Sequence, residues 1–163
     1  SVLLGSFSKT VAPGMRLGYM LTKNHEFLSH VETAKQASDL HTNIFAQYTL
    51  HHYLTNNPYE NHVEKIIALY KEQSAAMLAA MEKYFPPYVT YTKPEGGMFI
   101  WVTLPEGVNA LEKFHEAMEQ KVAFVPGNPF YTAKSEVNTM RLNYTNATPE
   151  IIEEGIKRLG EIL

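Results

Sequence analysis

A lysine and an arginine seven positions apart stand between two apolar runs near the start of the chain. Lys9 lies beside the hydroxyls of Ser6 and Ser8, and a Pro13-Gly14 turn separates it from Arg16. Held in one loop, hydroxyls and a guanidinium can bind a phosphate, while an unprotonated amine can condense with an aldehyde. The spacing therefore suits an aldehyde cofactor that carries a phosphate, and it equally suits a basic surface loop between two strands.

A second arginine interrupts an apolar strand pattern at residues 140–144. Strand alternation puts Arg141 and Asn143 on one face and the three apolar side chains on the other. A cation among apolar neighbours needs an anionic partner. Two kinds of partner are open: a substrate carboxylate held by both ends of the guanidinium fork, or an ion pair with Glu136 or Glu150.

Four segments of the chain resemble motifs of one enzyme family, in the same order. They are residues 6–18 (SFSKTVAPGMRLG), 94–101 (PEGGMFIW), 122–127 (VAFVPG) and 140–144 (MRLNY). The chain is similar to the class I/II aminotransferases of fold type I, which use pyridoxal 5′-phosphate. The subgroup with the strongest resemblance contains 2-aminoadipate and aromatic aminotransferases and the effector domains of GntR-type regulators.

This resemblance implies roles for the residues of the first motif. Lys9 would form the imine with the cofactor aldehyde, remove the substrate Cα proton and return it at the cofactor C4′ carbon. Burial and the nearby charge of Arg16 would favour the neutral amine that this chemistry needs. Ser6, Ser8 and Arg16 would bind the cofactor phosphate, with Lys9 also counted among the cofactor-binding residues.

Substrate-binding roles are implied for two later residues. Arg141 would hold the substrate α-carboxylate, and Gly97 would line the substrate site with its backbone. No metal site is expected, because adjacent histidines such as His51 and His52 point about 100° apart on a helix. These two histidines and His41 are interpreted as surface or interface residues.

The expected fold class is α/β, the C-terminal part of a pyridoxal phosphate-dependent transferase fold. Residues 1–60 are interpreted as a remnant of the large-domain sheet with connecting helices, and residues 61–163 as a small α+β domain. Relatives place a long segment before the lysine motif, so the chain is expected to be a C-terminal fragment that is inactive and binds the cofactor weakly by itself.

Hydrophobic periodicity and capping residues predict the elements. Buried strands are expected at 1–5 and 17–21. A long helix is expected from about 60 to 84, ended by Pro86-Pro87 and interrupted on its apolar side at Gln73-Ser74. Thr148 is expected to cap the last helix. The remaining expected helices lie near 25–37, 44–56 and 109–120, and the remaining strands near 89–91, 98–102, 123–125 and 139–143.

Composition sets limits on partners and location. The net charge is −3 with no basic cluster, which argues against a nucleic-acid surface. The chain has no cysteine, so disulfides and thiolate metal sites are excluded. No apolar run approaches the ~20 residues of a membrane span. A cytoplasmic protein without membrane partners is therefore expected, and the resemblance adds a homodimer acting on amino-acid and 2-oxo-acid substrates in amino-acid metabolism.

Three functions remain open. The first is an aminotransferase that moves an amino group from an α-amino acid to a 2-oxo acid. The second is an effector domain of a GntR-type transcriptional regulator that binds the same cofactor. The third is a pyridoxal phosphate-dependent β-lyase on the same fold.

Overall fold

The computed structural model describes residues 1–132 and 137–163. The chain divides into two compact units, Ser1–Ile66 and Ile67–Leu163, and each is described by itself. The division falls close to the predicted boundary at residue 60. The interpretation of the two parts as a large-domain remnant and a small domain stays a prediction.

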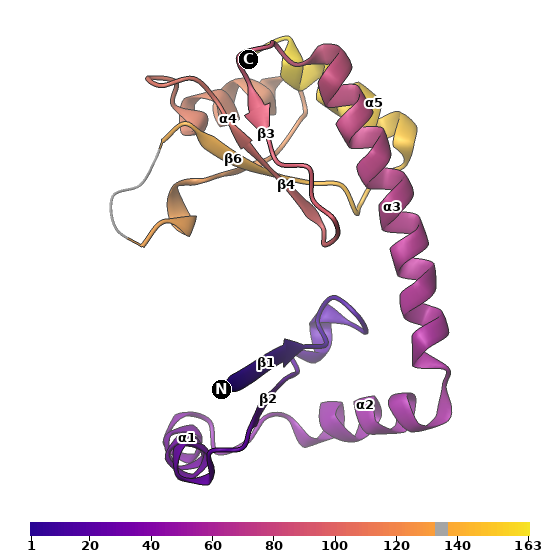
Figure 1. Cartoon of the computed structure of the whole chain (residues 1–163), viewed down its shortest axis with the longest axis vertical. Coiled ribbons are helices and arrows are strands. Elements are labelled where there is room, and N and C mark those ends of the chain that lie inside the picture. The colour runs from indigo at the N-terminus through magenta and orange to yellow at the C-terminus, as the bar shows by residue number, and fades with distance from the viewer. Residues whose placement is uncertain (133–136) are drawn as a thin grey trace. The chain divides into compact units, whose positions relative to one another are not determined.

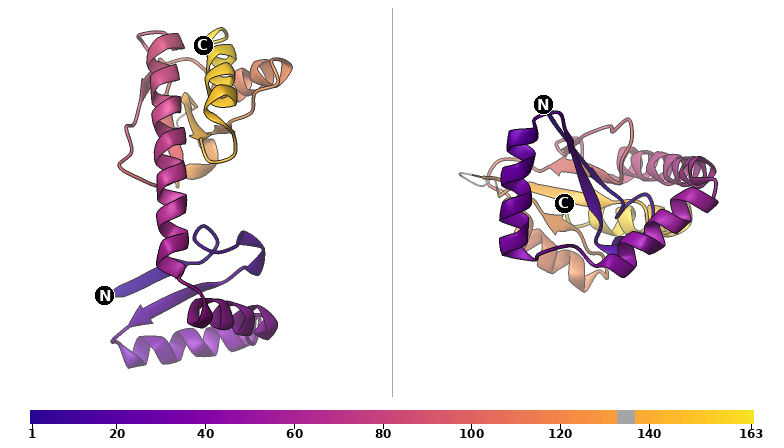
Figure 2. Two further views of the ribbon diagram at one scale, coloured as in Figure 1. Left: turned by 90° about the vertical axis from the view of Figure 1, so that its right-hand side faces the viewer. Right: turned by 90° about the horizontal axis from the view of Figure 1, so that it is seen from below.

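The unit Ser1–Ile66 contains a two-stranded antiparallel hairpin, two helices, and the first residues of a third helix, α3 (Tyr59–Tyr84) (Figures 1 and 2). The strands pair from Val2 opposite Thr22 to Ser6 opposite Gly18. The elements are β1 (Val2–Ser6), the 3₁₀ turn η1 (Pro13–Met15), β2 (Gly18–Thr22), α1 (His25–Ser38) and α2 (Ile44–Asn56). The hairpin places the whole lysine motif in the loop between its strands.

The burial predicted for these two strands is wrong. The side chains of Leu3, Leu4 and Leu21 are 56%, 73% and 63% exposed. An apolar run is buried only where another layer covers it, and within the described residues this sheet consists of β1 and β2 alone. The strand bounds themselves agree with the sequence prediction to within one residue.

Asparagine side chains start both helices of this unit. The Oδ1 atom of Asn24 accepts a hydrogen bond from the backbone amide of Phe27 at 2.9 Å. The Oδ1 atom of Asn43 accepts one from the backbone amide of Ala46 at 3.0 Å, at the start of the helix predicted near 44–56. Each bond satisfies an amide that the first helical turn leaves without a partner.

A four-stranded antiparallel sheet organises the unit Ile67–Leu163, with the strand order β3-β4-β6-β5. Figure 1 labels three of its strands, β3, β4 and β6. The strands are β3 (Thr90–Tyr91), β4 (Phe99–Thr103), β5 (Val125–Pro126) and β6 (Thr139–Asn143). The helical elements are α3 (Tyr59–Tyr84), which begins in the first unit, α4 (Ala110–Glu119), η2 (Asn128–Phe130) and α5 (Pro149–Gly160). No helix among residues 1–132 and 137–163 is long and apolar enough to cross a membrane.

One face of this sheet builds the core. Ile100 and Val102 of β4 and Met140 and Leu142 of β6 are at most 4% exposed, and their alternate neighbours point to the other face. Side chains of three helices complete the same core, namely Met77, Ala80 and Met81 of α3, Ala110 and Ala117 of α4, and Ile152, Ile156 and Leu159 of α5. The opposite face of the sheet therefore carries Trp101 and Arg141.

The polar interruption in α3 has a structural explanation. Gln73 is buried at 5% exposure, and its Nε2 atom donates a 2.8 Å hydrogen bond to the backbone carbonyl of Ala147. A buried amide needs such a partner, so Gln73 ties α3 to the segment that precedes α5. Thr148 stands at the N-cap of α5 as predicted, but its side chain makes no capping hydrogen bond.

We predict that Leu159→Ala lowers the free energy of unfolding of this unit by about 2–5 kcal/mol. Leu159 is fully buried in the core, and truncation removes apolar contacts and leaves a cavity. Trp101, the only tryptophan of the chain, belongs to this unit, so urea unfolding followed by its fluorescence measures the effect. The control Leu69→Ala, at a residue 49% exposed, should cost much less, and an equal loss for both variants would contradict the predicted core.

A surface ion pair predicts how stability depends on pH. Lys83 Nζ and the Tyr84 hydroxyl each donate a 2.9 Å hydrogen bond to Glu153 Oε1. The bond from Lys83 has the larger effect, and together the two bonds lower the pKa of the Glu153 carboxyl below its usual 4.5. The stabilisation is complete above pH 4.5 and is lost as the pH falls through the lowered pKa.

Lys83→Met should therefore destabilise the protein slightly at pH 7 and not at all once Glu153 is protonated. The effect is small because the pair is exposed to solvent. Urea midpoints at pH 7 and pH 3 measure it, with Lys93→Met as the exposed-lysine control. A midpoint difference between Lys83→Met and the wild type that is the same at both pH values would refute this assignment.

Candidate functional site

The loop with the lysine motif has a defined backbone. The Phe7 amide donates to the Leu17 carbonyl at 3.1 Å, which extends the hairpin by one step beyond its last strand pair. The amides of Val11 and Ala12 both donate to the Phe7 carbonyl, at 2.9 and 3.2 Å. These bonds close a tight turn around Lys9 at the end of the hairpin.

The predicted phosphate ligands Ser6 and Ser8 lie next to each other in this turn. The Ser6 Oγ atom accepts a 3.2 Å hydrogen bond from the Ser8 amide. Lys9 itself is exposed, so the burial expected for its amine is wrong for this structure. The side chain extends from the tip of a hairpin loop, where no layer of the described unit covers it.

Arg16 adopts an unusual backbone conformation. Its φ of 52° lies in the left-handed region, and it ends the 3₁₀ turn η1 with its Nη1 atom 3.4 Å from the Pro13 carbonyl oxygen. This conformation costs a non-glycine residue about 1–2 kcal/mol. Such strain is often found at ligand-binding positions, and the guanidinium that it carries here is exposed.

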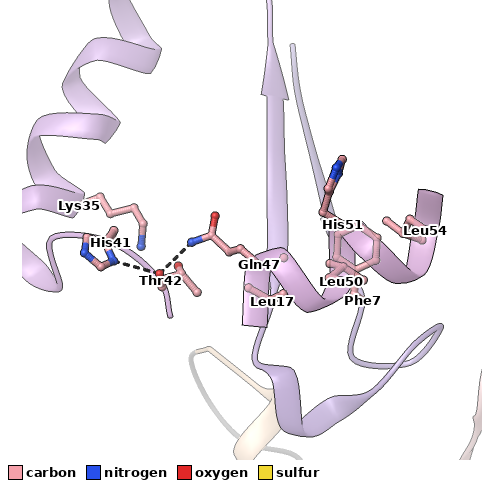
Figure 3. A pocket seen from close by; sticks show the side chains of 10 residues that line it. Phe7, Leu17, Lys35, His41, Thr42, Gln47, Leu50, His51 and Leu54 are labelled. Carbon is pink, nitrogen blue, oxygen red and sulfur yellow. Dashed lines mark hydrogen bonds between the residues drawn. The ribbon is translucent and has the colours of Figure 1, made fainter. Parts of the chain in front are cut away.

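Two hollows lie beside this loop within the first unit. One, of about 590 Å³, is lined by residues 14–16 and 45–46, Asp39, His41, Thr42, Asn43 and Thr49. The other, of about 500 Å³, is lined by Phe7, Leu17, Gly18, Lys35, His41, Thr42, Gln47, Leu50, His51 and Leu54 (Figure 3). Arg16 reaches the first hollow, while Lys9, Ser6 and Ser8 line neither of them.

In the segment before α2, sequence reasoning singled out His41 only as a surface or interface residue and did not assign Thr42 to a site. The Thr42 carbonyl accepts a 2.8 Å hydrogen bond from Gln47 Nε2 and lies 3.1 Å from His41 Nδ1 (Figure 3). His41 and Thr42 line both hollows. Asn43 fixes the start of α2, but a cap reports only where a helix begins and not which loop the preceding residues face.

Arg141 lies in the second unit at the centre of the sheet. It pairs with Trp101 of β4 on one side and with Val125 of β5 on the other. Its Cζ atom is 4.0 Å from the ring centroid of Phe99 and 4.6 Å from that of Phe130. The predicted mid-strand arginine is therefore confirmed, and its nearest neighbours are aromatic rings.

The two ion pairs considered for Arg141 have different outcomes. Glu136 lies outside the described residues. Glu150 forms no ion pair with Arg141, and the pKa of its carboxyl is instead lowered by hydrogen bonds from Thr148 and from its own backbone. Among residues 1–132 and 137–163, no carboxylate lies within 4.0 Å of the Arg141 guanidinium.

Gly97 lies in the turn that joins β3 to β4. Its φ of +90° explains why glycine stands there, because a residue with a side chain would strain the backbone in this conformation. Space is not the reason, since a Cβ at this position would meet no atom within 4 Å. Gly97 helps to line a hollow of about 440 Å³ with Ile67, Tyr70, Lys71, Ser74, Pro94, Glu95, Gly96 and Tyr144. Burial, and to a lesser extent Tyr70, raises the pKa of the Tyr144 hydroxyl in this hollow.

The predicted site residues thus form two groups. Lys9, Ser6, Ser8 and Arg16 belong to the unit Ser1–Ile66, whereas Arg141 and Gly97 belong to Ile67–Leu163. The first group offers an amine, two hydroxyls and a guanidinium from one loop. The second offers a guanidinium on an open sheet face and a glycine turn beside a separate hollow.

Comparison with known proteins shows which proteins the chain is similar to. Its sequence is homologous to aminotransferases over nearly its whole length, and its fold is that of the C-terminal part of their structures. The similarity predicted from the four motifs is confirmed. No protein-family model matches the chain.

Particular relatives can be named. The chain is 45% identical over 162 residues to aromatic-amino-acid aminotransferase 1 of Thermococcus litoralis, covering 99% of this chain and 39% of that protein. It superposes with a TM-score of 0.94 and 41% identity on α-aminoadipate aminotransferase from Thermus thermophilus, solved with N-(5′-phosphopyridoxyl)-L-leucine, covering 99% of this chain and 41% of that one. The chain therefore spans about two fifths of the length of its relatives.

A transcriptional regulator is also similar to the chain. The uncharacterized HTH-type regulator YisV of Bacillus subtilis is 30% identical over 158 residues, which cover 97% of this chain and 32% of the regulator. This identity is lower than that to the Thermococcus aminotransferase.

Proposed function

We propose that this chain is the C-terminal part of a pyridoxal phosphate-dependent aminotransferase that transfers an amino group from an α-amino acid to a 2-oxo acid. The observation that carries the proposal is the close superposition on an aminotransferase solved with a phosphopyridoxyl amino acid. The acting protein is proposed to be a cytoplasmic homodimer with amino-acid and 2-oxo-acid substrates.

The lysine loop contains suitable donors for this cofactor. The hydroxyls of Ser6 and Ser8 and the guanidinium of Arg16 come from one hydrogen-bonded loop, and such donors bind phosphate oxygens. The exposed amine of Lys9 lies in the same loop, where an aldehyde can reach it. The donor set of the loop therefore fits pyridoxal 5′-phosphate.

Each proposed role follows from the chemistry of the side chain. When bound, the cofactor supplies a pyridine ring that takes up the electron pair left at the substrate Cα. Lys9 Nζ acts as the base that removes the Cα proton and later as the acid that returns it. Arg16, Ser6 and Ser8 hold the phosphate, which fixes the cofactor in the loop.

The second unit is proposed to bind the substrate. The Arg141 guanidinium holds the α-carboxylate of the amino acid, because two parallel N–H groups match the two carboxylate oxygens. Gly97 lines the substrate site with its backbone. The lack of any carboxylate near Arg141 in the described residues supports the first role, since it leaves the guanidinium available to an anion.

Borohydride trapping tests the proposal. The full-length protein that contains this chain is incubated with pyridoxal 5′-phosphate, reduced, digested and mapped by mass spectrometry. We expect the pyridoxyl label on the peptide that contains Lys9. A label distributed over surface lysines such as Lys23 and Lys35, with none on Lys9, would overturn the proposal.

A second candidate is an effector domain of a transcriptional regulator, which the similarity to YisV supports. Both functions can use the same cofactor site, so trapping at Lys9 does not separate them. A DNA-binding domain encoded upstream of this chain, together with sequence-specific DNA binding and no transamination, would favour the regulator. Keto-acid production from an amino acid would favour the enzyme.

A further inference from the structure

Two aromatic rings lie against the Arg141 guanidinium on the open face of the four-stranded sheet. Phe99 and Phe130, here named the aromatic clamp, have ring centroids 4.0 and 4.6 Å from the Cζ atom. At these distances the positive charge lies over the negatively charged faces of both rings. A long side chain that would otherwise sample many rotamers is thereby held in one place.

Sheet register explains the position of Phe99. Trp101 lies directly opposite Arg141, and Phe99 is two residues before it on the same face of β4. This is a diagonal cross-strand position, which long and aromatic side chains can bridge. Phe99 therefore reaches Arg141 from the neighbouring strand without any change in the backbone.

Phe130 comes from the turn η2. Its ring packs against Trp101, and the turn itself is anchored to β6 through Gly127. Trp101 packs edge-on against Phe130 with ring centroids 5.5 Å apart and an interplanar angle of 84°. The turn follows Gly127, whose amide donates a 2.7 Å hydrogen bond to the Thr139 carbonyl. The two residues are so close that a Cβ on residue 127 would collide with Thr139. Phe130 is nevertheless 46% exposed, so the clamp opens to solvent.

The charge of Arg141 is not balanced by the protein groups that the structure describes. No carboxylate among residues 1–132 and 137–163 lies within 4.0 Å, and the buried Nε atom has no hydrogen-bond partner there. Rings stacked on a guanidinium leave its N–H groups free, because these point outward in the guanidinium plane. The arrangement therefore presents the edge of a fixed cation to an anion.

We propose that Phe130, together with Phe99, is a positioning residue that orients Arg141 to bind a carboxylate in the plane of its guanidinium. The identity of that carboxylate as the substrate α-carboxylate rests on the proposed function. The orientation of Arg141 by the rings does not, and it can be measured on this chain by itself.

The test uses the Nε–Hε resonances of the chain, which has three arginines, Arg16, Arg141 and Arg158. Ring currents should move the Arg141 Hε resonance upfield, whereas Arg158, whose Nε donates to Glu154 at 2.8 Å, serves as the internal control. Titration with propionate should shift the Arg141 signal, and titration with neutral propionamide should not.

Matched variants separate positioning from folding. Phe130→Leu keeps an apolar side chain but removes the ring, so we expect a smaller upfield shift and propionate affinity about 3- to 10-fold weaker. Phe130→Tyr restores the ring and should restore both signals. Phe27→Leu, on α1 in the first unit, should leave both unchanged.

The outcomes are distinct. Unchanged Arg141 shift and propionate affinity in Phe130→Leu would overturn the proposal, as would a wild-type Arg141 that does not respond to propionate. If the clamp behaves as expected but borohydride labels no Lys9 in the full-length protein, the proposed aminotransferase function fails while the carboxylate-binding clamp stands.

Discussion

Lys9→Ala is expected to lower the turnover number of the full-length protein by about 10³-fold or more and to abolish borohydride trapping. The variant removes the amine that is proposed to bind the cofactor and to move the Cα proton, and a positioned acid–base group alone contributes about 10²–10⁴-fold. Because Lys9 is exposed and makes no core contact, the fold should tolerate the change. Keto-acid production measured at saturating substrate gives the turnover number.

Two further variants sharpen this experiment. Lys9→Arg keeps the positive charge but cannot supply a neutral amine, so it should be as inactive as Lys9→Ala. Lys23→Ala removes another exposed lysine of the same unit and should retain nearly full activity. Substantial turnover in Lys9→Arg would show that the charge of Lys9, rather than its nucleophilic amine, is what matters.

Local signals were sufficient to predict the helices and strands. The long helix α3 ends at Tyr84, just before Pro86-Pro87, because proline cannot continue the backbone hydrogen bonds. The Oδ1 atom of Asn109 accepts a 3.0 Å hydrogen bond from the Leu111 amide and so caps α4, at the start of the helix predicted near 109–120. Capping and chain breaking depend on residues within one helical turn, so a single sequence contains the information.

Burial was predicted less well, because it depends on what covers an element. The apolar runs of β1 and β2 suggested buried strands, and yet Leu4 is 73% exposed. Lys9 was expected to be buried because imine chemistry needs a neutral amine, and it is exposed as well. An apolar composition shows that a strand is suited to burial. Whether the strand is buried depends on the layers of structure that pack against it.

The surroundings of Arg141 show how far the pattern of the site could be predicted. Strand alternation correctly separated Arg141 from Met140 and Leu142, which are buried. Its contacts with Phe99 and Phe130 depend on the register between β4 and β6 and on the fold of η2. A register shift of one residue would reverse the face of Phe99, and no local signal in the sequence fixes that register.

Arg141→Lys is expected to lower kcat/KM for the amino donor by roughly 30- to 1000-fold, equivalent to about 2–4 kcal/mol. Lysine keeps the positive charge, but it loses the planar fork that matches a carboxylate and the plane that stacks on Phe99. Most of the loss should appear in KM, because the proposed contact of Arg141 with the carboxylate orients the substrate before the proton is moved. Initial rates over a range of amino-acid concentrations measure both parameters.

The matched control for this prediction is Arg158→Lys. Arg158 pairs with Glu154 on the exposed side of α5, and lysine can replace it there with little change in kcat/KM. Borohydride trapping at Lys9 should survive in Arg141→Lys, because the proposed cofactor ligands lie in the other unit. Loss of trapping in a folded Arg141→Lys protein would mean that Arg141 acts on the cofactor rather than on the substrate carboxylate, and the division of roles between the two arginines would then be wrong.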